Sequence, residues 1–161
     1  MPDLTTPTFA TPEGTKNYAD RMWAENPKIS PDSWRMLEGL TVSKVATGTY
    51  RMDGRENQPQ ALEKALTSGL NLIDTSANYM DGGAEVFIGQ TLKKLFRQQK
   101  LKREEVVLVS KAGYMQGKTL ATWHKAPPPE VVPCADTMWH CIHPDFLHHE
   151  FDNTLNRLGV T

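Results

Sequence analysis

Short apolar runs alternate with segments of helical periodicity between residues 40 and 158. Three runs are rich in leucine and β-branched residues and predict strands, at residues 40–50, 70–74 and 104–111. Three segments with apolar residues at helical spacing predict helices, over residues 59–69, 84–101 and 144–158. Strands that alternate with helices in this way indicate a parallel α/β fold. The sequence therefore predicts about three βα units.

Two further regions lack a sustained period. Residues 1–38 mix proline, threonine and charged residues with scattered aromatics, which predicts an irregular amino-terminal arm ahead of an α/β region at residues 39–161. Residues 112–142 contain the sequence APPPEVVP, whose prolines disfavour a helix interior or a sheet ladder. A long loop is predicted there, and an excursion of this length is typical of a functional segment.

The composition is that of an ordinary globular protein and excludes several classes of function. The chain has 161 residues and a formal net charge of -1, so neither nucleic acid nor an acidic membrane surface is indicated as a partner. No apolar run approaches the roughly 20 residues that cross a bilayer, and the amino terminus lacks the features of a secretory signal. We therefore expect a cytoplasmic protein in which Cys134 and Cys141 are free thiols.

Polar and aromatic residues stand at the carboxyl ends of the three predicted strands. They are Gly48, Thr49, Tyr50, Asp74, Tyr79 and Lys111. In a (β/α)8 barrel the strand ends face one shared mouth, where the chemistry is assembled. A lysine ammonium favours the ionised form of a neighbouring tyrosine, and an aspartate can pair with that lysine and hold it in place. Such a group can protonate a carbonyl oxygen while hydride reaches the carbon, so Asp74, Tyr79 and Lys111 are the candidate catalytic residues.

The same residues lie in segments that resemble the aldo-keto reductase family. The segments are GTY at 48–50, NLIDTSANYMDGGAEVFIGQTL at 71–92 and VVLVSKAGY at 106–114. The resemblance covers about residues 40–161 and implies the amino-terminal half of a (β/α)8 TIM barrel. It implies an oxidoreductase that uses NADP(H), or NAD(H), on a carbonyl or sugar alcohol. It also implies that Asp74, Tyr79 and Lys111 match three of the family's four catalytic positions, with Tyr79 as the proton donor.

The resemblance also divides the cofactor site. Gly48, Thr49 and Tyr50, with Asp74, match the part of the family's site that lies along the nicotinamide. The family's fourth catalytic residue, a histidine, follows a fourth strand, and Thr161 precedes that strand. Strands five to eight hold most of the remaining cofactor site in the family. We therefore expect this chain by itself to be inactive.

Each candidate residue alone has a more ordinary interpretation. An aspartate at a strand end is often a cap or turn residue, and a tyrosine or lysine there is often a residue at the solvent boundary. Only the joint spacing favours catalysis.

The cysteines and histidines between residues 134 and 149 lack the spacing of a zinc site, so no metal is predicted. His143 precedes Pro144 at a helix start and is predicted to be a cap or loop residue, not to replace the missing histidine.

Two other functions stay open at this point. The chain could be a non-catalytic half-barrel module whose exposed sheet edge pairs with a second copy or with another protein. Alternatively, Lys111 could form a Schiff base in an aldol-type barrel enzyme, because lysines at strand ends also serve that chemistry.

Overall fold

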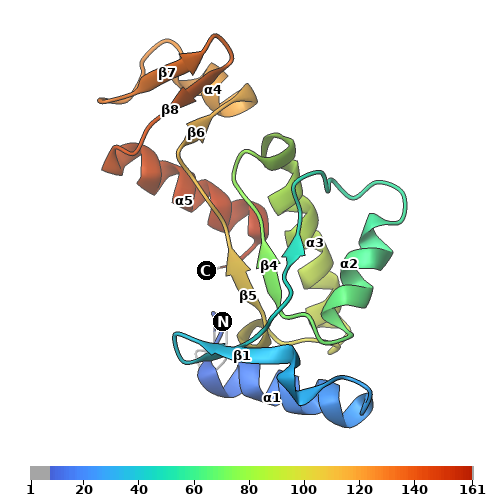
Figure 1. The fold of residues 1–161 in the computed structure, drawn as a ribbon. Coiled ribbons are helices and arrows are strands. Elements are labelled where there is room, and N and C mark those ends of the chain that lie inside the picture. The colour runs from blue at the N-terminus through green and yellow to red at the C-terminus, as the bar shows by residue number, and fades with distance from the viewer. Residues whose placement is uncertain (1–7, 161) are drawn as a thin grey trace, which may run out of the picture.

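The centre of the molecule is a three-stranded parallel sheet. The computed structural model describes residues 8–160. The strands are β3 (Thr47–Gly48), β4 (Leu72–Asp74) and β5 (Val107–Val109), in the order β3-β4-β5. Thr47 lies opposite Ile73, which lies opposite Leu108. The predicted parallel sheet is therefore confirmed, with all three carboxyl ends at one edge (Figure 1).

Three helices cover this sheet: α2 (Gln58–Leu66), α3 (Gly83–Arg97) and α5 (Pro144–Leu158). Their apolar stripes and the strands form one hydrophobic core. Its fully buried members include Leu62, Leu66, Ile73, Ile88, Leu92 and Leu95. Helices α3 and α5 pack very closely, because a Cβ atom on Gly89 would lie 2.6 Å from the carbonyl oxygen of Leu158. The three predicted helices are thus confirmed, and Gly159 ends α5 in the left-handed conformation.

The expectation of an irregular arm over residues 1–38 is wrong for most of the part that the structure describes. Helix α1 (Pro12–Glu25) begins at Thr11, whose side chain accepts a hydrogen bond from the amide of Gly14. The buried Tyr18 hydroxyl donates to the carbonyl of Leu66 over 2.7 Å. The helix was missed because its apolar residues are few, although Thr11 followed by Pro12 is a typical helix start.

A small hairpin follows α1. A single turn of 3-10 helix, η1 (Pro31–Ser33), leads into β1 (Trp34–Leu37), which pairs antiparallel with β2 (Leu40–Ser43). Glu38 and Gly39 both have positive φ in the connecting turn, the geometry that suits a two-residue hairpin. The single strand predicted at 40–50 is therefore two strands, β2 in this hairpin and β3 in the parallel sheet. Figure 1 shows α1 and the hairpin beneath the amino ends of the parallel strands.

The predicted loop at residues 112–142 also has regular structure. It contains β6 (Tyr114–Met115), α4 (Gly117–Trp123), β7 (Val132–Ala135) and β8 (Met138–His140), with strand order β6-β8-β7. Pro133 is tolerated because β7 is an edge strand. We call residues 112–142 the excursion; it has a small core of Met115 and Cys141 against Phe146 of α5.

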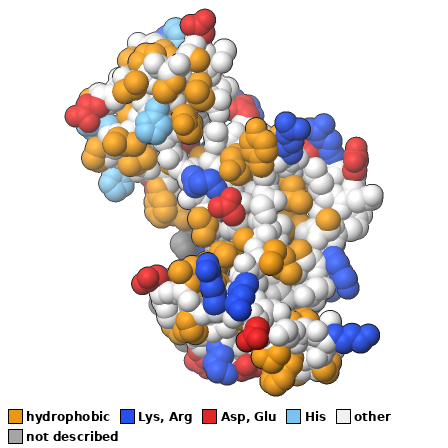
Figure 2. All heavy atoms as spheres, viewed as in Figure 1, with side chains coloured by type: hydrophobic (Ala, Val, Ile, Leu, Met, Phe, Trp, Pro, Cys, Tyr) orange, Lys and Arg blue, Asp and Glu red, His pale blue; other side chains and the backbone are white. Residues whose placement is uncertain are grey.

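The surface follows this division. Figure 2 shows histidine side chains gathered on the upper part of the molecule, over the excursion and α5, among exposed hydrophobic side chains. Lysine and arginine side chains appear mainly over the α/β body. Among residues 8–160, no helix is both long enough and apolar enough to span a bilayer.

Candidate functional site

The central contact of the site joins the ends of β4 and β5. Because these strands are hydrogen-bonded neighbours, Asp74 and Lys111 emerge side by side. Lys111 Nζ lies 2.7 Å from Asp74 Oδ1, and each side chain is 44% exposed. The ion pair therefore fixes the lysine at a solvent-accessible edge, as the sequence predicts for a catalytic group.

Tyr79 joins this pair from the segment after β4. It begins η2 (Tyr79–Gly82), a short 3-10 turn in which Met80 and Asp81 have positive φ. Lys111 Nζ lies 5.1 Å from the centroid of the Tyr79 ring, so the ammonium is placed over the ring face. Tyr50 approaches Tyr79 edge-on, with 5.2 Å between the ring centroids. The structure thus brings all three predicted catalytic residues together, with a second tyrosine beside them.

The residues predicted to lie beside the nicotinamide differ in their surroundings. The amide and the hydroxyl of Thr49 both donate to the carbonyl of Asp74, over 3.2 and 2.9 Å. Thr49 is buried, so its visible role is to fasten the end of β3 to the end of β4. Tyr50 is 64% exposed, and a Cβ atom added to Gly48 would meet open space. Tyr50 and Gly48 are accordingly exposed, whereas Thr49 is buried.

Two residues before η2 hold the backbone of Lys111. The amide of Ala77 and the hydroxyl of Ser76 both donate to the Lys111 carbonyl, over 3.0 and 3.1 Å. Sequence reasoning did not single them out, although both lie inside the quoted motif between Asp74 and Tyr79. They tie the segment that carries Tyr79 to the segment that carries Lys111.

The excursion is attached to the same turn. The Asn78 side chain donates to Gln116 Oε1 over 2.8 Å, and the amide of Lys118 donates to Asp81 Oδ1 over 2.9 Å. Both contacts flank Tyr79 in sequence. The excursion therefore contacts the turn that carries Tyr79.

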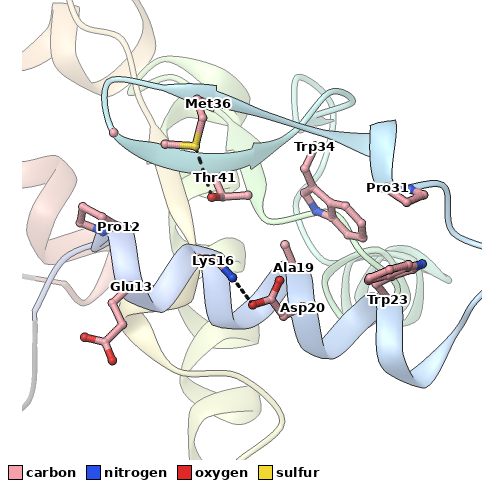
Figure 3. A pocket seen from close by; sticks show the side chains of 11 residues that line it. Pro12, Glu13, Lys16, Ala19, Asp20, Trp23, Pro31, Trp34, Met36 and Thr41 are labelled. Atoms are coloured by element: carbon pink, nitrogen blue, oxygen red, sulfur yellow. Dashed lines mark hydrogen bonds and ion pairs between the residues drawn. The ribbon is translucent and has the colours of Figure 1, made fainter.

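Two concavities lie on the α/β body, and one of them borders the site. A groove of about 780 Å³ lies between β5 and α5, with Ser110 and Lys111 among its polar residues and Leu147, Phe151 and Leu155 among its apolar ones. A second pocket, of about 660 Å³, lies between α1 and the β1–β2 hairpin. Figure 3 shows Trp23 and Trp34 at one end of this pocket and the Lys16–Asp20 ion pair along α1. The second pocket is lined by α1 and the hairpin, which lie at the amino ends of the strands (Figure 1), and none of its lining residues belongs to the Asp74–Lys111 site.

The cysteines and histidines do not form a metal centre in the described part of the chain. No group of three or more histidine, cysteine, aspartate or glutamate side chains there could hold a metal ion. Cys134 is exposed and Cys141 is buried, and both are free. His143 caps α5, since its Nδ1 accepts a hydrogen bond from the amide of Asp145 over 3.3 Å. Of the two roles predicted for His143, cap or loop residue, the structure shows the cap.

Comparisons with known proteins decide the family. The model of the Aldo/keto reductase family matches residues 44–161. This chain belongs to the aldo-keto reductase family. The NADH-specific methylglyoxal reductase of Escherichia coli is 28% identical over 130 residues, which cover 75% of this chain and 36% of that protein.

Solved aldo-keto reductases share the fold. The glycerol dehydrogenase of Gluconobacter oxydans aligns with a TM-score of 0.58 and 22% identity, over 81% of this chain and 37% of the other. A Bombyx mori aldo-keto reductase in complex with NADP aligns with a TM-score of 0.50 and 20% identity, over 78% and 34%. The chain thus spans about a third of the length of these relatives. The expected fold class, an incomplete (β/α)8 barrel of about three βα units, is confirmed.

Proposed function

We propose that this chain supplies the proton-delivering part of a nicotinamide-dependent reductase that acts on a carbonyl or sugar compound. The observation that carries the proposal is the contact between Lys111 and Asp74, at 2.7 Å, with the same ammonium over the ring of Tyr79. Family membership supports oxidoreductase chemistry. The names of the relatives support small carbonyls and polyols as the substrate class.

Each residue has a defined role in the proposed reduction. Tyr79 gives its hydroxyl proton to the carbonyl oxygen of the substrate. Lys111 favours the phenolate that remains, because a nearby cation stabilises a developing negative charge. Asp74 holds the lysine in position through the ion pair. A nicotinamide cofactor supplies the hydride when it is bound.

The residues fit such a cofactor at one end. The ring of Tyr50 is exposed and lies edge-on to Tyr79, so it offers an accessible aromatic surface beside the proton donor. We propose Gly48, Thr49, Tyr50 and Asp74 as the part of the cofactor site contained in this chain, with Thr49 acting through the backbone of Asp74. NADP is the proposed cofactor, as in the silkworm complex, with NAD as the alternative, as in the methylglyoxal reductase.

A chimera tests the proposal. Residues 44–161 replace the matching segment of the methylglyoxal reductase, and oxidation of NADH and NADPH is measured with methylglyoxal and a panel of aldehydes. The proposal predicts turnover by the folded chimera and none above background by the 161-residue chain. A folded chimera that leaves both cofactors unoxidised, while the parent enzyme consumes NADH, contradicts it.

A second candidate function rests on the edge of the sheet. Among the described residues β5 pairs only with β4, and Val109 and Phe151 are exposed beside that edge. Unpaired strand edges invite pairing with another chain. The chain would then be a non-catalytic module that associates with itself. Size-exclusion chromatography over a range of concentrations tests this function, and a monomer at every concentration contradicts it.

A further inference from the structure

A buried carboxylate lies behind the end of β5. Glu85, in the first turn of α3, is fully buried. Its Oε1 accepts a hydrogen bond from the hydroxyl of Ser110 over 2.6 Å, and its Oε2 lies 2.6 Å from Arg157 Nε of α5. One side chain therefore joins α3, α5 and the end of β5.

Both oxygens of the buried Glu85 carboxylate have partners. Burial of an ionised carboxylate is unfavourable unless the charge is paired and the oxygens accept hydrogen bonds. Arg157 supplies the counter-ion, and it also lies 3.8 Å from Glu150. The pair of Glu85 with Arg157 links α3 to α5, whereas the bond to Ser110 links α3 to the end of β5.

The bond to Ser110 bears on the site, because Lys111 is the next residue. The hydroxyl of Ser110 is held toward α3 by Glu85, whereas the side chain of Lys111 is paired with Asp74 and lies over the ring of Tyr79. A restraint on Ser110 therefore also limits where the backbone can present the following lysine. The backbone of Lys111 is held from the other side, where Ala77 and Ser76 bind its carbonyl.

Because β5 is an outer strand of the parallel sheet, the bond between Ser110 and Glu85 adds a support to its end. In residues 8–160 β5 has one strand partner, β4, and a groove lies along its other edge. The pairing with β4 ends at Val109, two residues before Lys111. Beyond Val109, the hydrogen bond from Ser110 to Glu85 of α3 restrains the end of the strand.

We propose that Glu85 is a positioning residue, which uses the hydroxyl of Ser110 and the counter-ion Arg157 to keep Lys111 against Asp74 and Tyr79. The effect of Glu85 on turnover rests on the proposed reductase function, whereas its effect on the position of Lys111 does not. Glu85 and Ser110 thus form a support for Lys111 that is independent of the ion pair with Asp74.

The test separates positioning from simple packing. Ser110→Ala removes the hydroxyl and leaves Glu85 paired with Arg157, whereas Ser110→Thr keeps a hydroxyl at the same position. The 161-residue chain is treated with an amine-reactive reagent, and the labelling rate of each lysine is measured by mass spectrometry of its peptides. Ser110→Ala should label Lys111 about two- to fivefold faster than the wild type, the range expected when a partly exposed ion pair is loosened. Ser110→Thr should restore the slow rate.

A matched control lies elsewhere on the chain. Glu63 of α2 binds Lys94 and Lys100, each over 2.7 Å, and these ion pairs include none of the site residues. Glu63→Gln should raise the labelling of those two lysines and leave Lys111 unchanged. If the alanine variant is not folded, Ser110→Cys, which is nearly isosteric and a weak donor, takes its place.

Wild-type labelling of Lys111 in Ser110→Ala overturns the inference, as does failure of Ser110→Thr to restore the slow rate. Labelling needs no turnover, so an inactive chimera with faster labelling would contradict the proposed reductase and leave the positioning role of Glu85 intact.

Discussion

The α/β body and the excursion are stabilised in different ways. The body has one continuous core that draws on α1, α2, α3, α5 and the parallel sheet. The excursion has a core of Met115, Cys141 and Phe146 and is fastened to the rest by side-chain hydrogen bonds at Asn78 and Asp81. The comparison teaches that the turn carrying Tyr79 lies between a body with an extensive core and an attachment with a small core.

The largest effect should follow from a cavity in the body. Leu92→Ala removes a fully packed side chain of α3 and should lower the free energy of unfolding by about 2–5 kcal/mol. Met115→Ala in the excursion should lower global stability less, because a small peripheral core can open without unfolding the body. Thermal and urea denaturation of both variants measure the difference. Equal losses would show that body and excursion unfold as one unit.

A smaller effect is expected at the attachment itself. Gln116→Ala removes the acceptor for Asn78 and should cost about 1 kcal/mol, the usual net value of a hydrogen bond. Amide hydrogen exchange should rise in residues 114–123 and around Tyr79, with little change in α2 or α3. Thr122→Ala is the control, because its hydroxyl bonds only within α4. Identical exchange in the two variants would contradict an attachment through Asn78.

Acid should weaken the ion pairs of Glu63 with Lys94 and Lys100 over a defined pH range. Lys100 and Lys94 lower the pKa of Glu63 to about 2, below its ordinary value of 4.5. Because the folded state has the lower pKa, this contact stabilises the protein above pH 4.5 and is lost as the pH falls toward 2. The stability of Glu63→Gln should therefore decline less than that of the wild type between pH 4.5 and 2. Parallel declines would contradict a role for the Glu63 ion pairs.

The smallest effect is expected from metal removal. The cysteines and histidines of the excursion are predicted to be ordinary surface and core residues, so a chelator should leave the thermal transition and the helical circular dichroism signal unchanged. A transition that falls on chelation and recovers with zinc would show that the excursion holds a metal.

The body could be predicted from sequence because its apolar periodicity is strong. The stripe of α3 and the β-branched run of β5 require burial, and parallel strands bring Asp74 and Lys111 to one edge. The excursion could not be predicted, since its strands are short and one contains Pro133. Glu85 was missed because a glutamate in a first helical turn is ordinarily exposed, and its partner Arg157 lies 72 residues away. Helix α1 was missed because a few buried residues, such as Tyr18, fix it by long-range contacts.

The most direct measurement is the turnover of Tyr79→Phe in the chimera that carries residues 44–161. If Tyr79 delivers the proton, the turnover number should fall about 10²- to 10⁴-fold, the range for loss of a general acid. The control is Tyr114→Phe, at an exposed tyrosine three residues after Lys111. Its turnover number should stay within about twofold of that of the unmodified chimera, whereas loss of a catalytic acid lowers turnover at least about 10²-fold. Turnover of Tyr79→Phe equal to that of Tyr114→Phe would contradict the assignment of Tyr79, and with it the proton-delivering role of the site.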